Sequence, residues 1–281
     1  MQIIRQISAM RGWSEAARGA GERIALVPTM GFLHQGHLSL VREAKRRAGR
    51  VVVSIFVNPK QFGESEDFAG YPRDFERDCA LLEKEEIDVL FHPAVEDMYP
   101  PQFQTRVEVD KLSLPLCGAV RPGHFRGVTT VVAKLLNIVH PHAAIFGEKD
   151  YQQLQVVRRM VQDLNIDTEI IGHPIVREPD GLAMSSRNVY LTPAERQAAA
   201  CLSRSLCKAE GLFKRGERAA GAIVHVARAE LEREPLACVE YVKLCDAETL
   251  DELERIEDRA VLALAVRIGR ARLIDNRVLG R

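Results

Sequence analysis

The chain has 281 residues, of which 46% are hydrophobic and 28% are charged, and its 39 basic side chains balance 39 acidic ones. This length is enough for one large domain or two smaller ones. A formal charge of zero argues against a broad nucleic-acid-binding surface, which would need an excess of lysine and arginine. No segment approaches the roughly 20 apolar residues of a membrane span.

The cysteines show no Cys-x-x-Cys spacing; they are Cys79, Cys117, Cys201, Cys207, Cys238 and Cys245. A chain this long needs no disulfides, so we expect buried or partly buried free thiols in a reducing compartment. Residues 1–13 contain two arginines and no continuous apolar stretch, so we expect no signal peptide. We therefore expect a cytoplasmic protein with neither nucleic acid nor a membrane as partner.

Residues 1–175 alternate two patterns, short apolar runs and apolar residues at helical spacing. The apolar runs are residues 24–27, 51–57, 87–91, 143–146 and 168–171. The helical patterns start near residue 37 and cover 74–86, 128–139 and 154–164. This alternation predicts an α/β fold with a doubly wound, Rossmann-like parallel sheet, and ligands at the carboxyl ends of its strands.

The pattern changes after residue 175. Thr192 and Pro193 are suited to the N-cap and first turn of a long helix over residues 193–214, and a second helix is expected over 218–233. Strands are expected at residues 239–244, 260–268 and 271–274, the last two forming a hairpin around Gly269. We therefore predict two domains, residues 1–175 and a small α+β domain over residues 176–281.

The most informative segment is residues 27–40, where a short apolar run ends at Pro28, a glycine-bearing loop follows, and an amphipathic helix begins at about His37. Backbone N–H groups at such a helix N-terminus favour phosphate. His34 and His37 add donors that can follow charge developing on phosphorus. Alone, the pair could also be two solvated helix residues or half of a metal site. Its context favours a nucleotide triphosphate site with chemistry at the α-phosphate.

Two further segments hold polar side chains. Asn58 and Gln61 follow the second strong strand, where their amides suit the hydroxyl or carboxylate groups of a small polar substrate. An Asn-Pro turn is the alternative interpretation. Residues 121–127 contain two arginines that could meet an anion, but interface or capping roles remain equally open, and we assign this segment no catalytic role.

The segment Phe-Gly-Glu-Lys-Asp-Tyr-Gln-Gln at 146–153 leads from a strand into a helix. Lys149 could bind a phosphate, Asp150 a ribose hydroxyl or Mg²⁺, and Gln153 could face the same crevice. A cation is disfavoured at a helix N-terminus, and an anionic ligand would remove that conflict. In residues 183–188, Ser185 to Arg187 could clamp a triphosphate, although this run alone is also typical of a polar loop.

Together these segments resemble the pantothenate synthetase family of the cytidylyltransferase-like nucleotidyltransferase superfamily. The matching residues are 28–40, 58–73, 121–127, 146–153 and 184–188. The His-x-Gly-His form indicates only the superfamily, because aminoacyl-tRNA synthetases share it, whereas Asn-Pro-x-Gln-Phe and Gly-Glu-Lys-Asp-Tyr-Gln-Gln are typical of the family. The resemblance covers nearly the whole chain and is least distinctive in the C-terminal domain. No functional position departs from the pattern, and Lys60 lies in a variable slot.

The resemblance implies an enzyme that condenses pantoate with β-alanine, using ATP and Mg²⁺, through pantoyl adenylate. The implied catalytic residues are His34, His37, Lys149 and Arg187. The implied ATP-binding residues are Met30, Gly31, His34, Gly36, His37, Gly147, Glu148, Lys149, Asp150, Val176, Met184, Ser185, Ser186 and Arg187. Gln61 and Gln153 would bind pantoate with Asn58 close by, Gln61 would also meet β-alanine, and Asp150 is a candidate to lie near Mg²⁺. A homodimer is implied by the resemblance alone.

Three alternatives remain. Another nucleotidyltransferase moving AMP or CMP onto a small phosphorylated acceptor would need cations where Asn58, Gln61 and Gln153 lie. An RNA-binding, tRNA-ligase-like protein is opposed by zero net charge. A catalytically silent nucleotide-binding regulator is disfavoured by the full set of phosphate-facing side chains.

Overall fold

The computed structural model describes residues 1–63 and 66–280, and these form two compact units. Unit 1 contains residues 1–113, 121–148 and 153–174, and unit 2 contains residues 114–120, 149–152 and the chain from 175 onwards. Two short segments before residue 175 thus make their contacts with unit 2. The expected domain boundary at residue 175 stays a prediction.

In the described part of the chain, unit 1 is built on a parallel sheet of six strands. In spatial order its strands are β1 (Gln2–Ile4), β4 (Val89–Phe91), β3 (Arg50–Ile55), β2 (Ile24–Thr29), β5 (Ala143–Gly147) and β6 (Glu169–His173). The order runs outward in one direction from β2 and in the other from β5. The predicted doubly wound sheet is therefore confirmed, with its switch point between β2 and β5.

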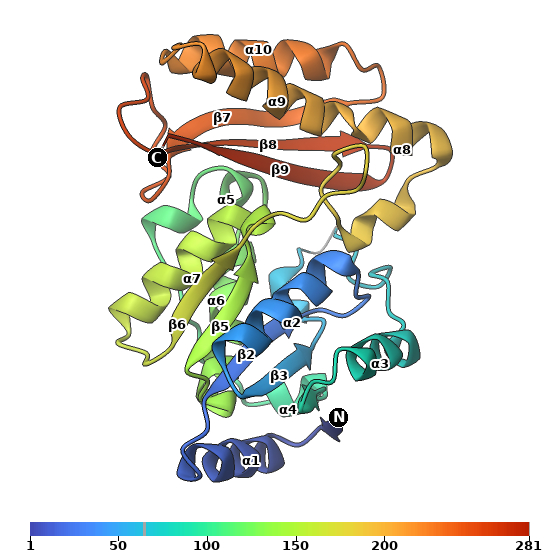
Figure 1. Cartoon of the computed structure of the whole chain (residues 1–281), viewed down its shortest axis with the longest axis vertical. Coiled ribbons are helices and arrows are strands. Elements are labelled where there is room, and N and C mark those ends of the chain that lie inside the picture. Colours follow the sequence, from blue (N-terminus) through green and yellow to red (C-terminus); the bar gives the residue numbers. More distant parts are fainter. Residues whose placement is uncertain (64–65, 281) are drawn as a thin grey trace. The chain divides into compact units, whose positions relative to one another are not determined.

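Helices cover both faces of this sheet (Figure 1). Side chains of α1 (Ile7–Gly19), α6 (His124–Val139) and α7 (Tyr151–Asp163) pack in one core, and α2 (Gln35–Arg47) and α3 (Phe75–Lys84) border the other. Ile24 and Leu26 point into the first core, while Ala25 and Val27 point into the second. A strand buried on both faces reads as the continuous apolar run seen in the sequence. The shorter elements are η1 (Pro59–Gln61), α4 (Val95–Met98), η2 (Lys111–Ser113) and η3 (Glu148–Asp150).

Strand β2 continues through Pro28, which we had expected to end it. The backbone carbonyl of Ile24 accepts the N–H of His142, so the backbone groups of Ile24 face β5. Backbone groups alternate sides along a strand, so those of Pro28, four residues later, face β5 as well. Pairing of β2 with β5 stops at Leu26, whereas pairing with β3 continues to Thr29. The missing N–H of Pro28 therefore removes no ladder bond, and β2 separates from β5 at the switch point.

Unit 2 contains an antiparallel sheet with the order β7 (Cys238–Asp246), β8 (Ala260–Ile268) and β9 (Ala271–Leu279). Its described helices are α5 (Cys117–Val120), η4 (Ser186–Tyr190), α8 (Pro193–Ala199), α9 (Cys201–Lys214) and α10 (Ala220–Glu232). Apolar side chains of α8, α9 and α10 pack with the sheet in one core. The predicted small α+β region and its hairpin at Gly269 are confirmed.

Several predicted boundaries were wrong. The helix expected over residues 193–214 is interrupted at Ala200, whose N–H bonds three residues back to Gln197. Its apolar spacing continues across this tightened turn, so the pattern carries no sign of the break. Strand β1 and helix α1 were not predicted, although α1 buries Met10 and Ala17 seven residues apart.

All six cysteines lie among the described residues, and none forms a disulfide. Cys117, Cys201 and Cys245 are buried and Cys79 is partly buried, as expected, but Cys207 and Cys238 are exposed. Burial raises the pKa of Cys201 to about 11, which keeps its thiol protonated at neutral pH. No helix in the described part of the chain is long and apolar enough to cross a membrane.

Candidate active site

Three loops leave neighbouring strands at the carboxyl edge of the unit 1 sheet. Residues 30–34 follow β2, residues 56–58 follow β3, and Glu148 follows β5. These loops, the η1 turn and the first turn of α2 carry the predicted site residues of unit 1. The exceptions are Gly147, which ends β5, and Gln153, which is the third residue of α7. The predicted segments thus gather where the doubly wound fold places a ligand site.

Two histidines cap helix α2. The helix begins at Gln35 and not near His37, because His34 is its N-cap. His34 Nδ1 accepts the N–H of Gly36 at 3.1 Å, and His37 Nδ1 faces the N–H of His34 at 3.4 Å. This is a capping box in which imidazole nitrogens replace the usual side-chain oxygens. The ring centroids are 4.1 Å apart, so the rings lie side by side at a helix N-terminus.

The capping contacts also set the tautomer of both rings. A neutral imidazole that accepts through Nδ1 carries its hydrogen on Nε2. His34 and His37 therefore each present an Nε2–H donor. Donors beside a helix N-terminus suit an anion such as phosphate, whereas a metal ion needs a ring nitrogen with an unprotonated lone pair.

Asp78 holds the loop that precedes these histidines. Its two carboxylate oxygens accept the N–H groups of Phe32 and Leu33, both at 2.7 Å. Gly31 has φ +81°, and a Cβ there would lie 3.0 Å from Asp78 Oδ2. Burial raises the pKa of Asp78, partly offset by these two N–H bonds. Sequence analysis missed Asp78, although its place one turn before the buried Leu82 was a sign that it faces inward.

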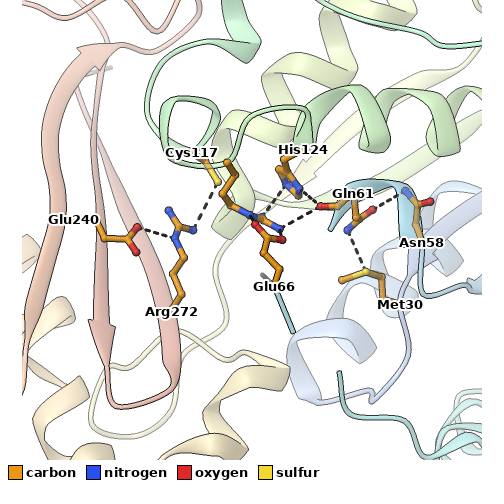
Figure 2. Close-up of polar contacts among 9 residues, drawn as sticks. Met30, Asn58, Gln61, Glu66, Cys117, His124, Glu240 and Arg272 are labelled. Carbon is orange, nitrogen blue, oxygen red and sulfur yellow. Dashed lines mark hydrogen bonds and ion pairs between the residues drawn. The ribbon is translucent and has the colours of Figure 1, made fainter. Parts of the chain in front are cut away.

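Asn58 is only 1% exposed, and its side-chain amide is fully hydrogen-bonded; Figure 2 shows its contact with Gln61. Its Nδ2 donates to Gln61 Oε1 at 3.1 Å and to the carbonyl of Gly127 at 3.0 Å. Its Oδ1 accepts from the N–H of Lys60 and from the hydroxyl of Tyr99, at 3.2 and 2.8 Å. All four hydrogen-bonding positions of the amide are thus occupied, so in this arrangement Asn58 orients Gln61.

Gln61 is held from three sides (Figure 2). Its side-chain Nε2 lies 3.1 Å from Met30 Sδ. Its backbone carbonyl accepts from His124 Nδ1 at 2.8 Å and from Arg121 Nη2 at 3.3 Å. Arg121 also pairs with Glu66 at 2.5 Å. Residues 121–127 therefore anchor the Gln61 loop in this structure. Within its amide, Gln61 retains one donor and one acceptor position beyond these bonds.

In unit 2, strand β9 holds two predicted ATP-binding segments. Asn276 Nδ2 donates to the carbonyl of Lys149 at 3.0 Å. The neighbouring Asp275, whose side chain is fully buried, binds both terminal nitrogens of Arg177 at 2.7 and 2.9 Å. The prediction ended this strand at Ile274, just before the two polar residues Asp275 and Asn276. The buried ion pair and the amide bond explain why the strand continues.

The predicted triphosphate clamp begins beside Val176, whose carbonyl accepts the N–H of Met184 at 3.0 Å. Ser185 is the N-cap of η4, and its hydroxyl accepts the N–H of Arg187 at 3.3 Å. Ser186 is buried, while Met184, Ser185 and Arg187 are partly exposed. The segment is thus an ordered turn, and of its two serines Ser185 is the more accessible.

Three charged residues of alternating sign, Glu148, Lys149 and Asp150, follow β5. Lys149 Nζ lies 3.8 Å from Asp150 Oδ2, and the Lys149 side chain is 20% exposed. Gly147 ends β5, and Glu148 begins η3. No group of three or more His, Cys, Asp or Glu side chains in residues 1–63 and 66–280 could hold a metal ion.

Unit 1 is thus an α/β protein whose doubly wound sheet has, at its switch point, a helix N-terminus suited to phosphate. The sequence model described as pantoate-beta-alanine ligase matches residues 2–278. The chain belongs to this family.

Relatives and solved structures agree over the full length. Pantothenate synthetases from Thermotoga neapolitana and Geobacter sulfurreducens are 59% and 58% identical over 280 residues, covering 100% of this chain and 100% and 99% of theirs. The crystal structure of the Thermus thermophilus enzyme matches with a TM-score of 0.94 and 46% identity, covering 99% of both chains. The Francisella tularensis ligase, complexed with beta-gamma ATP and β-alanine, matches with a TM-score of 0.81 and 34% identity, covering 99% of this chain and 97% of that one. The predicted fold and pantothenate-forming ligase activity are confirmed.

Proposed function

We propose that this chain forms pantothenate in two steps at the carboxyl edge of the unit 1 sheet. The family gives the overall reaction, and the capping geometry of His34 and His37 carries the proposed route. First, a carboxylate oxygen of pantoate bonds to the α-phosphorus of ATP, and the bond to the bridging oxygen breaks to release pyrophosphate. The amine of β-alanine then attacks the acyl carbon of the adenylate, loses a proton, and displaces AMP.

The first step needs positioning and charge stabilisation more than covalent help. We assign the donors to His34, His37, Lys149 and Arg187, which would face the phosphates. The Nε2–H groups set by the capping box can follow charge that develops on the α-phosphate oxygens. Pyrophosphate is a stable leaving group, so the role of His37 in stabilising charge is larger than a role as proton donor.

The remaining site residues are proposed as binding groups. The proposed ATP-binding residues are Met30, Gly31, Gly36, Gly147, Glu148, Asp150, Val176, Met184, Ser185 and Ser186. Gln61 and Gln153 would bind pantoate, and Gln61 would also meet β-alanine. Because the Asn58 amide is saturated, it would contribute by fixing the orientation of Gln61. The beta-gamma ATP and β-alanine named for the Francisella tularensis ligase support both ligands here.

We also propose that Mg²⁺ accompanies ATP. With no cluster of three metal-ligating side chains in the described residues, the ion would be held mainly by phosphate oxygens and water, as Mg²⁺ commonly is. Asp150 is the carboxylate proposed to lie near it. Bound Mg²⁺ would neutralise charge on the departing pyrophosphate.

A cytoplasmic homodimer is proposed on the family resemblance alone. Sedimentation of the purified chain over a range of concentrations tests the dimer. A single species with the mass of one chain at every concentration would contradict it.

Pantothenate formation tests the proposed function directly. Purified protein is incubated with ATP, Mg²⁺, pantoate and β-alanine, and products are quantified by mass spectrometry. We expect equal amounts of pantothenate, AMP and pyrophosphate, and no pantothenate when any one organic substrate is omitted. Transfer of AMP or CMP onto a phosphorylated acceptor without pantothenate would instead support the rival nucleotidyltransferase.

A further inference from the structure

A cavity of about 710 Å³ lies between α1 and α6 in unit 1. Its volume falls in the range of small-molecule sites, roughly 300–1,000 Å³. Helix α1 contributes Ile7, Arg11, Ser14, Glu15 and Arg18, while Lys134, Asn137, Ile138 and His140 come from α6 and its C-cap.

The cavity wall carries unbalanced positive charge. Arg11, Arg18 and Lys134 face a single acidic residue, Glu15. Among residues 1–63 and 66–280, none of these four forms an ion pair within 4.0 Å. Arg18 instead donates to the carbonyl of His140 at 2.9 Å. Basic side chains in a concave site without acidic partners attract anions, because the surrounding protein focuses their field.

A buried hydroxyl in the same wall lacks a partner. Ser14 is 1% exposed, and its Oγ has no hydrogen-bond partner in the described part of the chain. Buried hydroxyls normally have a hydrogen-bond partner, so Ser14, which lines the cavity, is an exception that a bound ligand would satisfy. Lys134 stacks its ammonium on Tyr99 and Phe103, at 5.9 and 5.0 Å from the ring centroids. Burial, and then the nearby Arg11, lower the pKa of Lys134, because both disfavour its charged form. A bound anion would favour that charged form.

The cavity is separate from the candidate active site. Near its N-terminus, α6 contacts the Gln61 loop through Gly127, at the carboxyl edge of the sheet. It then runs back to His140, just before β5 begins at the opposite edge. The 16 residues of α6 span about 24 Å, and the cavity is lined by their second half.

We propose that this cavity binds a small polyanion carrying two or more phosphate or carboxylate groups. Arg11, Arg18 and Lys134 would bind its charged groups, and the Ser14 hydroxyl would donate a hydrogen bond. The ligand class follows from three cations around a space too large for one isolated anion.

Calorimetric titration of the full chain with citrate and with tripolyphosphate tests the proposal and separates carboxylate from phosphate chemistry. We expect saturable binding of at least one probe, weakened at least about tenfold in an R11Q/K134M double variant. The matched control is R228Q/K214M on α10 and α9, which removes the same charge from exposed helix positions. The control should bind as the unchanged protein does.

Pantothenate formation measured in the same variants serves as a folding check, because neither pair belongs to the candidate active site. Binding that is equal in R11Q/K134M and the unchanged protein would overturn the proposal, and so would the absence of saturable binding by both probes. Equal weakening in the two double variants would show a net-charge effect and would overturn it as well. Retained activity in R11Q/K134M, with binding lost, would assign the anion to the cavity.

Discussion

At the scale of single residues, the two histidines join structure to chemistry. Each Nδ1 is directed to the backbone at the start of α2, which leaves each Nε2 to carry hydrogen. One contact therefore fixes the ring, its tautomer and the direction of its donor. The sequence could predict that the pair lies at the start of a helix after a strand, and its phosphate chemistry stays a proposal. It could not reveal the capping box, because histidine is not a usual capping residue.

Replacing His37 with alanine should slow adenylate formation more than it weakens pantoate binding. One charge-stabilising donor typically contributes about 10²–10³ in rate. Rapid-quench measurement of a single turnover, together with pantoate titration, separates the two effects. H225A, at an exposed position of α10, is the control and should leave both unchanged. A slowing of less than about threefold in H37A would remove His37 from the mechanism.

At the scale of elements, close packing between α6 and η1 positions Gln61. A Cβ on Gly127 would lie 2.2 Å from the carbonyl oxygen of Lys60 and 2.6 Å from the N of Gln61. Both are backbone atoms, so the loop or the helix must shift to accept a side chain. The Asn58 amide, which bridges the Gly127 carbonyl and Gln61, would then lose its geometry.

The G127A variant should therefore lose about 1–3 kcal/mol of stability through overpacking and bind pantoate more weakly. Urea unfolding and the KM for pantoate measure these effects. G12A on α1 is a matched control, because a Cβ there meets nothing within 4 Å and the helix should gain up to about 1 kcal/mol. Unchanged stability and pantoate KM in G127A would contradict the proposed packing role.

Elements were predictable where periodicity is strong and less so where polar residues are buried. The central strands β2, β3 and β5 were found because both faces are covered, which produces continuous apolar runs. Strand β9 was cut short at Asp275, whose carboxylate is buried against Arg177. Such partners lie about 100 residues apart, so local pattern cannot pair them.

At the scale of the whole molecule, stability on the acid side should depend on Glu230. This side chain is 9% exposed, and it binds Lys208 and Arg204. The hydrogen bond from Lys208 is the largest cause that lowers the pKa of Glu230, and burial partly opposes it. A lowered pKa stabilises the folded state above the unfolded value of about 4.3, and this stabilisation is lost as pH falls through the folded pKa.

The E230Q variant should be less stable by about 1 kcal/mol at pH 7, a figure reduced because both basic partners are half exposed. The difference should shrink below about pH 4.3. Urea unfolding across this range checks it, with E232Q on the exposed face of α10 as control. A stability difference that is constant with pH would contradict the ionic role of Glu230.

The segments that carry the candidate site could be predicted from the sequence, but the hydrogen bonds that hold them in place could not. Loops after parallel strands meet at one sheet edge, so the segments around His34, Gln61 and Gly147 could be grouped from the sequence. Asp78, Tyr99 and their hydrogen bonds come from elements without a recognisable motif, and only packing brings them to the loops.

Pyrophosphate release with each substrate omitted in turn tests the proposed adenylate route most directly. Carboxylate attack on the α-phosphate precedes any contact with the amine, so a coupled pyrophosphate assay should show release that requires pantoate. A burst equal to the enzyme concentration should appear with ATP and pantoate alone, without β-alanine. Release that ignores pantoate, or that appears only when β-alanine is present, would contradict the route.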